Sequence, residues 1–286
     1  QSSHTVIQII HENKPFILDS IRVALNRIDI NVRLIIHAEG IRFIRDINGN
    51  IQKIIALDMH DKSNAVKDSS IIEAPIYIEI DRQSDSIMLD KIYKAITNVI
   101  DDVDVMVKDW AKMLSKLTNT IALLESLTKK QSKDNLHEVI LFLRWLAANN
   151  FTFIGVAEYN FVSDADLSFN IEYIHGSGLG VLSEDKIVSK TSKFQDMYPA
   201  AREEMLGQEI LLLGKTNTPS TVHRPAYTDF VLIKLFDVNG KLVKIIKFIG
   251  LYTSIVYNTN VENVPFIRKK ISRVLAMAGF PKASHD

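Results

Sequence analysis

Cysteine is absent from the 286-residue sequence. Its absence excludes disulfide frameworks, thiolate metal sites and cysteine nucleophiles, and it fits a reducing compartment. An excess of charge is absent too, because 34 lysines and arginines balance 34 aspartates and glutamates. Nucleic-acid partners require a concentrated basic surface, so this balance argues against them. No apolar run approaches the roughly 18 residues of a membrane span, and the first residues form no signal peptide. We therefore expect a cytoplasmic protein that binds neither nucleic acid nor membranes.

The residues that are present have the composition of a folded protein. Hydrophobic residues make up 47% and charged residues 24% of the chain, which is typical of globular proteins. The length fits about two domains. Because the chain begins at Gln1 instead of methionine and ends at Asp286 without a tapering tail, we expect it to be a segment of a longer protein.

The pattern of residues 1–108 predicts a ferredoxin-like domain. Apolar residues recur at helical spacing after Pro15, and a second helical stripe covers 89–100. Asn48-Gly49 separates two apolar runs and predicts a β-hairpin, because both residues accept a positive φ. Strands are expected at 5–10, 31–37, 41–47, 51–57, 76–80 and 103–107, and an exposed loop at 59–70. This order gives a ferredoxin-like layout with one added hairpin.

The remainder of the chain predicts a helical linker and a second domain, so that the whole chain is of the α+β class. Asp109 is the expected N-cap of a helix within the linker, residues 109–134. The second domain, residues 135–286, begins with a helix and continues as an antiparallel sheet of PAS-like layout. Its strands are expected at 151–161, 169–174, 210–213, 227–236 and 242–252, with a short helix at 197–206 and a terminal helix opened by Pro265 and closed by Gly279.

The segment between the first strand and the first helix is the first candidate site. In ACT domains, which sense amino acids, this loop typically reads Asp-x-Pro-Gly-Leu-Leu. The present loop resembles that pattern at Pro15, Ile17 and Leu18, but Phe16 stands where glycine lets the backbone approach a ligand. We therefore expect an ACT-like fold, with a side chain in the ligand space. The residues proposed for an effector or interface loop are Asn13, Lys14, Pro15, Phe16 and Asp19.

A dense polar group in the second domain is the second candidate site. Its members are Ser220, Thr221, His223, Arg224, Tyr227 and Asp229. Serine, histidine and aspartate together would suit a hydrolase, but Ser220 follows Pro219 in a loop and not on a G-x-S-x-G elbow. A hydrogen-bonded network that holds the loop at the sheet edge is the favoured interpretation, and the hydrolase is the alternative.

Motifs for nucleotides and metals are incomplete. The glycine cluster Gly176–Gly180 has Val181 in place of the third glycine of G-x-G-x-x-G, and it suits a tight loop or, alternatively, a small anion nest. Glu209 stands where a P-loop ending at Gly214-Lys215-Thr216 needs its first glycine. The eight histidines form no zinc motif. We therefore expect no catalytic, cofactor-binding or metal-binding residue in this chain.

Several strings together resemble the N-terminal region of the large NAD-dependent glutamate dehydrogenases of bacteria. They include NKPFILDS (13–20), LRWL (143–146), NFTFIG (150–155), GSGLG (176–180), STVHRP (220–225) and GLYTS (250–254). The resemblance implies a parent enzyme that oxidises L-glutamate to 2-oxoglutarate and ammonia with NAD, in a catalytic core downstream of Asp286. It implies that the present segment regulates that core or builds a homo-oligomer. The alternative is an amino-acid-sensing ACT-type module of another enzyme.

Overall fold

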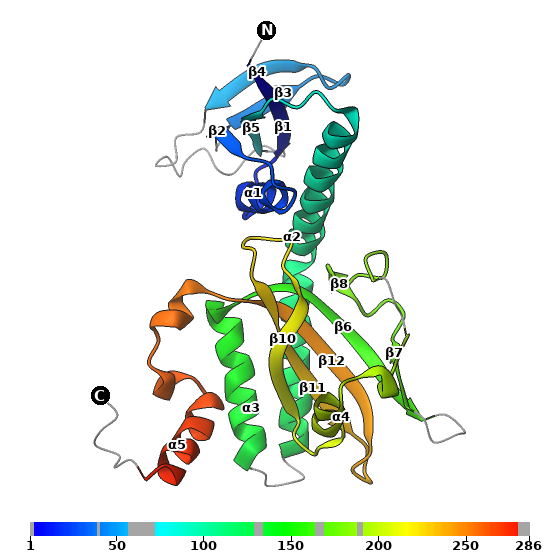
Figure 1. Cartoon of the computed structure of the whole chain (residues 1–286). Coiled ribbons are helices and arrows are strands. Elements are labelled where there is room, and N and C mark those ends of the chain that lie inside the picture. The colour runs from blue at the N-terminus through cyan, green and yellow to red at the C-terminus, as the bar shows by residue number, and fades with distance from the viewer. Residues whose placement is uncertain are drawn as a thin grey trace. The chain divides into compact units, whose positions relative to one another are not determined.

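The computed structural model describes residues 3–38, 41–56, 72–128, 134–163, 169–187 and 191–279. The chain divides into two compact units (Figure 1). The first unit comprises residues 1–107 together with the short segment 221–225, and the second comprises residues 108–220 and 226–286. The loop expected at 59–70 lies outside the described residues.

The first unit contains a five-stranded antiparallel sheet. Its elements are β1 (His4–Glu12), α1 (Ile17–Arg27), β2 (Val32–His37), β3 (Ile41–Arg45), β4 (Ile51–Ala56), β5 (Ile72–Asp81) and the first part of α2 (Ser86–Thr128). Strand β5 is central, because it pairs with β1 along one edge and with β2 and β3 along the other. The predicted hairpin around Asn48-Gly49 is confirmed as β3–β4, and Gly49 has the positive φ that the turn requires.

The core of this unit follows from two periodicities. In β5 every second side chain is buried, from Ala74 to Ile80, because alternate residues point to the same face of a sheet. In α1 the buried apolar residues include Ile17, Ile21 and Leu25, which repeat at the spacing of one helical face. These two apolar surfaces, with the buried residues of α2, form the core of the first unit.

The strand predicted at 103–107 is wrong. These residues belong to α2, which runs without a break over 43 residues. Val103 and Met106 are buried and continue a helical stripe that starts at Ile92 and ends at Leu124. The Val-Asp-Val-Met-Val alternation fits a strand over five residues, but the 3.6-residue period holds over the longer window, and no glycine or proline interrupts it. Asp109 is accordingly inside α2 and is no N-cap.

The second unit contains a seven-stranded antiparallel sheet in the order β10-β11-β12-β6-β7-β9, with β8 paired to β6. Its strands are β6 (Phe151–Ser163), β7 (Phe169–Tyr173), β8 (Leu179–Gly180), β9 (Thr191–Lys193), β10 (Leu211–Pro219), β11 (Tyr227–Phe236) and β12 (Leu242–Tyr252). Its helices, besides the end of α2, are α3 (Asp134–Trp145), α4 (Pro199–Leu206) and α5 (Ile267–Met277). The hairpin at Asn239-Gly240 and the end of α5 before Gly279 are confirmed.

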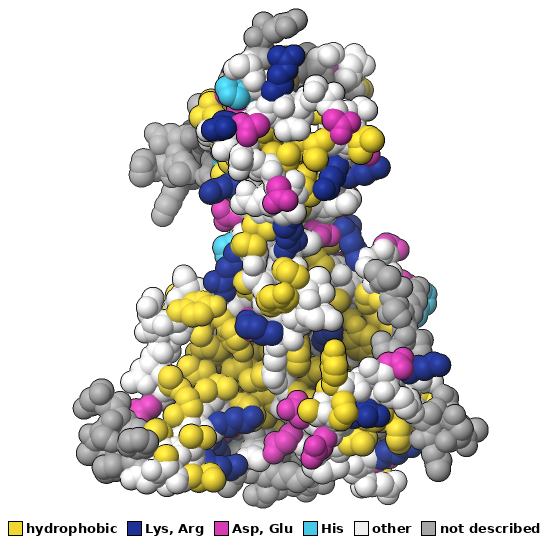
Figure 2. Space-filling model, in the orientation of Figure 1, with side chains coloured by type: hydrophobic (Ala, Val, Ile, Leu, Met, Phe, Trp, Pro, Cys, Tyr) yellow, Lys and Arg dark blue, Asp and Glu magenta, His cyan; other side chains and the backbone are white. Residues whose placement is uncertain are grey.

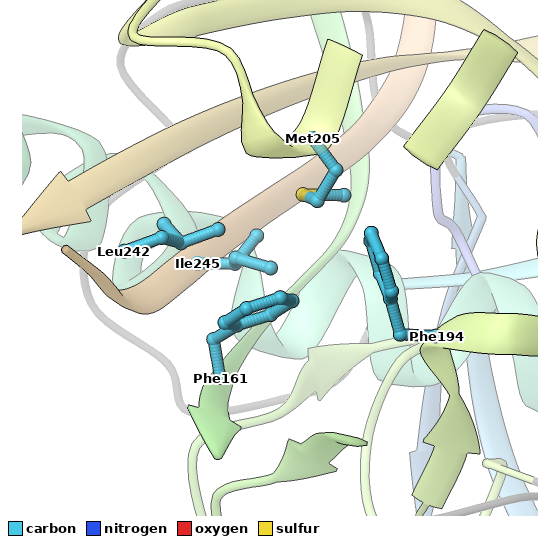
Figure 3. Close-up of a cluster of buried hydrophobic side chains, with 5 residues drawn as sticks. All are labelled: Phe161, Phe194, Met205, Leu242 and Ile245. Carbon is cyan, nitrogen blue, oxygen red and sulfur yellow. The ribbon is translucent and has the colours of Figure 1, made fainter. Parts of the chain in front are cut away.

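One face of this sheet carries an apolar cluster. Phe161 and Ile245 from the sheet meet Phe194 and Met205, the latter from α4 (Figure 3). We call the face that carries Phe161 and Ile245 the cluster face. Helix α4 is held there by Lys234, whose Nζ donates to the carbonyl oxygens of Glu204, Met205 and Gly207 at 2.6–3.0 Å. The lysine thereby supplies partners for carbonyls that the end of a helix leaves unpaired.

The terminal helix of the second unit is anchored by a buried carboxylate. Glu138 of α3 accepts hydrogen bonds from the Phe266 backbone N–H at 2.8 Å and from Arg268 Nη2 at 2.7 Å.

Hydrophobic side chains are visible on the surface of the second unit, over α3 and strand β10 (Figure 2). None of the described helices is long and apolar enough to cross a membrane.

Candidate functional site

A cavity of about 440 Å³ opens at the start of α1. It is lined by residues 13–19 and by His37 at the end of β2. All five residues of the proposed effector loop, Asn13, Lys14, Pro15, Phe16 and Asp19, therefore lie at one cavity in the first unit. Their role toward an effector stays a prediction.

The backbone of Phe16 has the conformation that explains the glycine of ACT loops. Phe16 has φ 69° and ψ −3°, in the left-handed region. A side chain in this region costs about 1–2 kcal/mol, whereas glycine adopts it freely. The carbonyl oxygen of Phe16 accepts two hydrogen bonds from Ser20, at 2.6 Å from Oγ and 2.9 Å from the backbone N–H. The loop therefore keeps a glycine-type shape while its phenyl ring lines the cavity.

Lys14, which lines the cavity, is held by two carboxylates. Its Nζ lies 2.8 Å from Asp104 Oδ1 and 3.1 Å from Glu12 Oε2. Burial acts to lower the pKa of Lys14, but the hydrogen bonds to Asp104 and Glu12 outweigh burial, so the pKa is raised above its ordinary value. His11 Nε2 also contacts Asp104, at 3.2 Å. Asp104 therefore ties the loop before α1 to α2.

His223 of the second candidate site meets the first. Its backbone N–H donates to Ser20 Oγ at 2.9 Å, across 203 residues of sequence. Its ring contacts the ring of Phe16, with centroids 4.6 Å apart, and its Nδ1 lies 3.5 Å from Asp19 Oδ2. The two candidate groups, separate in sequence, thus share the start of α1. We call the segment Thr221–Pro225 the docking loop.

The docking loop is fixed at its other residues as well. Thr221 Oγ1 donates to Asp102 Oδ2 of α2 at 2.7 Å. Val222 is fully buried, and the Arg224 N–H donates to its carbonyl oxygen at 3.0 Å. The contacts that hold the loop are therefore made with α1 and α2, and not only with the edge of the sheet from which the loop extends.

The remaining members of the polar group have different partners. Asp229 Oδ1 forms an ion pair with Lys215 Nζ at 2.7 Å. The Ser220 backbone N–H donates a hydrogen bond to the Ala226 carbonyl oxygen at 2.8 Å, across the base of the loop. Tyr227 starts β11 and pairs with Pro219. The carboxylate beside His223 is therefore Asp19, whereas Asp229 is paired with Lys215.

The glycine cluster forms a tight loop that uses its own N–H groups. The Gly180 N–H donates to Asp109 Oδ2 at 3.1 Å, and the Gly178 N–H to Tyr173 Oη at 3.0 Å. A Cβ atom on Gly178 would lie 2.0 Å from the Leu182 carbonyl oxygen, so only glycine fits. The Asp109 carboxylate occupies the place that an external anion would take in the alternative interpretation.

Sequence patterns missed the acidic and hydroxyl partners of the site. Asp104 falls in 103–107, which resemble a strand, and Asp102 has the pattern of a solvated residue on a helix surface. Ser20 is an ordinary helix residue until His223 reaches it. The signal that could have found them was the uninterrupted helical period of α2. Within the described ranges, no group of three His, Asp or Glu side chains is arranged to hold a metal ion.

Comparisons with known proteins bear on the first unit and on the whole chain. Residues 1–96 match the family model described as glutamate dehydrogenase, ACT1 domain. The whole chain is 34% identical to the NAD-specific glutamate dehydrogenase of Pseudomonas aeruginosa and 31% identical to that of Halomonas elongata. Each match covers 100% of this chain but only 17% of the relative. Residues 1–96 are thus similar to the ACT1 domain of glutamate dehydrogenases, and the whole chain is similar to the N-terminal region of the large NAD-specific enzymes.

Proposed function

We propose that this chain is the regulatory and oligomer-assembly region of an NAD-dependent glutamate dehydrogenase and is itself non-catalytic. The parent enzyme would convert L-glutamate, NAD and water into 2-oxoglutarate, ammonia and NADH. NAD and the reacting atoms would be held by a catalytic core in another part of the parent. The similarity of the whole chain to two NAD-specific glutamate dehydrogenases supports this parent reaction.

The observation that carries the regulatory role is the shared use of the start of α1. Phe16 and Asp19 line the cavity, and the same two residues contact His223 of the docking loop. An effector in the cavity would compete for these side chains or reorient them. Its binding would therefore change the stability of the docking loop, which is the differential contact that regulation requires.

The charges around the cavity suit an amino-acid effector. Lys14 and the N-terminus of α1 are positive and would bind the α-carboxylate, whereas the half-exposed Asp19 carboxylate would accept the α-ammonium. The ring of Phe16 restricts the remaining space to a small or flexible side chain. These assignments follow from charge and cavity size.

Binding of amino acids to the chain tests this role. In a thermal-shift screen, a ligand at 100 times its Kd adds about 2.7 kcal/mol to the free energy of unfolding. We expect a shift with at least one amino acid, and we expect Asp19→Ala to abolish it. Asp90→Ala, which removes an exposed charge of α2 paired with Lys94, is the matched control and should keep the shift.

Turnover assays test the division between this region and the core. We expect no glutamate-dependent NAD reduction by the 286-residue chain and normal reduction by the parent protein. In the parent, His223→Ala should alter the change in turnover caused by the amino acid that stabilises the chain. His175→Ala should not alter it, because the His175 side chain is 86% exposed. Turnover by the chain alone, or the absence of a thermal shift with every amino acid, would contradict the proposal.

Exposed apolar residues support the assembly role. Val6, Ile10, Leu34 and Ile36 lie on the face of the first sheet that the β1–β5 and β2–β5 registers place opposite the buried residues of β5. Ile10 and Ile36 are 57% and 55% exposed. We propose that this face contacts a second copy or the downstream core. Light scattering should show an oligomer for the chain and a smaller species for Ile36→Asp; an unchanged mass would remove this face from the interface.

We propose that residues 1–108 act as the ACT-like domain, 109–134 as a helical linker and 135–286 as a PAS-like domain, in a cytoplasmic enzyme. The antiparallel sheet of the second unit, with helices packed on it, supports the PAS-like layout. The alternative function is an amino-acid-sensing module of another enzyme. It would be favoured if the parent bound the same amino acid but lacked glutamate dehydrogenase activity.

A further inference from the structure

Lys247 occupies an unusual place for a lysine, on the cluster face of the second sheet. In β12 it lies directly between Ala157 of β6 and Leu232 of β11. Ile245, two residues earlier in β12, belongs to the apolar cluster (Figure 3). Because alternate residues of a strand point to the same face, Lys247 is on the face that carries Ile245. Its ammonium group therefore emerges from an apolar part of the sheet.

The other lysines with lowered pKa values show how this protein normally satisfies such groups. Lys234 donates to three backbone carbonyl oxygens, and Lys116 pairs with the carboxylate of Glu158, as does its neighbour Lys244. For Lys247 no hydrogen bond or ion pair exists with any residue that the structure describes. Burial alone lowers its pKa below the ordinary value. A partly buried cation without a partner is costly, because low polarity disfavours the charged form.

A second polar group lies beside it. Tyr159 is on β6, two residues from Ala157, and pairs with Ile245, so it is a diagonal neighbour of Lys247 on the same face. Burial raises the pKa of Tyr159 to about 12, which keeps its hydroxyl protonated. The ring packs against Tyr173 with centroids 6.0 Å apart. Within the described part of the chain, no hydrogen bond uses the Tyr159 hydroxyl.

We propose that Lys247 and Tyr159 bind the carboxylate of an organic acid whose apolar body rests on the cluster face. The ammonium supplies the opposite charge and the hydroxyl donates a second hydrogen bond, a pairing that fixes a carboxylate in position. Leu232, which is only partly buried and pairs directly with Lys247, provides apolar contact for the part of the ligand next to the carboxylate. This site lies in the second unit and is independent of the cavity at α1 and of the parent reaction.

Phenylacetate and its neutral analogue phenylacetamide are the probes. Titrations of the 286-residue chain by NMR should show saturable binding of phenylacetate at millimolar concentration and binding of phenylacetamide at least about tenfold weaker, since charge-assisted hydrogen bonds contribute roughly 1.5–3 kcal/mol. Lys247→Met should remove the preference for the carboxylate. Tyr159→Phe should weaken phenylacetate binding, and Lys241→Met, in the exposed β11–β12 turn, should leave it unchanged.

A measurement on the unaltered chain keeps the test valid if a variant fails to fold. Acetylation of each lysine by acetic anhydride is measured by mass spectrometry. Phenylacetate should slow the acetylation of Lys247 and leave that of Lys241 unchanged. The proposal is overturned if phenylacetate shows no saturable binding, if the amide binds equally well, if a folded Lys247→Met keeps the preference, or if acetylation of Lys247 is not slowed.

Discussion

Ser20 offers the sharpest test of how the docking loop is held. Its side chain is fully buried on α1. Its Oγ donates to the Phe16 carbonyl oxygen at 2.6 Å and accepts the His223 N–H at 2.9 Å. Ser20→Ala removes one oxygen atom and adds no bulk. The substitution therefore deletes the two hydrogen bonds and leaves the surrounding packing in place.

The destabilisation expected for Ser20→Ala follows from the hydrogen bond that each partner of Ser20 Oγ loses. The Phe16 carbonyl oxygen retains the Ser20 backbone N–H at 2.9 Å, so its loss is small. The His223 N–H becomes an unsatisfied donor, which costs about 1–3 kcal/mol when it stays shielded from water. Alanine recovers about 0.5 kcal/mol through its higher helix propensity. We expect a net destabilisation of about 1–2 kcal/mol.

Two measurements check this value. The free energy of unfolding in urea should fall by that amount, and exchange of the His223 amide hydrogen should accelerate about tenfold or more, since 1.4 kcal/mol corresponds to a factor of ten. Ser126→Ala is the matched control, because Ser126 is exposed on α2 and its Oγ bonds only within its own helix, to Leu123. A change below about 0.5 kcal/mol together with unchanged exchange at His223 would refute the role given to Ser20.

Three further outcomes are expected in the second unit. The hydrogen bond from Arg268, more than any other cause, lowers the pKa of Glu138. The ionised Glu138 carboxylate therefore stabilises the folded chain above the ordinary carboxyl pKa, and this stabilisation is lost as pH falls through the lowered native pKa. Urea unfolding across the acid range should show this loss, and Glu138→Gln should flatten it; an unchanged pH dependence would count against the pairing. Lys234→Met should cost about 2–4 kcal/mol in the same assay, because three carbonyl oxygens lose their donor; a loss below about 1 kcal/mol would show that water replaces the ammonium. Gly180→Ala should lower the melting temperature strongly, because its Cβ would lie 2.2 Å from the Ile154 carbonyl oxygen at a φ of +61°; a wild-type melting curve would contradict this close approach.

Local patterns predicted those elements whose signals lie within a few residues. The hairpins at Asn48-Gly49 and Asn239-Gly240 follow from turn chemistry, because Gly49 and Gly240 supply the positive φ that reverses the strand. The expected positive φ at the two asparagines is not found. The alternation at 103–107 predicts a strand where the structure has α2, because the alternation fits five residues whereas the helical period becomes clear only over a longer window. Window length, and not residue type, decided between the two.

The sequence by itself determined the first unit's ACT-like character, the two hairpins and the loop from Asn13 to Asp19. Each depends on residues that are neighbours in the chain, so spacing alone carries the information. Tertiary structure alone decided that His223 reaches Ser20 and Phe16, and that Lys247 lies on an apolar face with no counter-charge among the residues that the structure describes. The hydrogen bond between His223 and Ser20 joins residues 203 positions apart. The position of Lys247 depends on strand register. Neither feature produces a periodic pattern in the sequence.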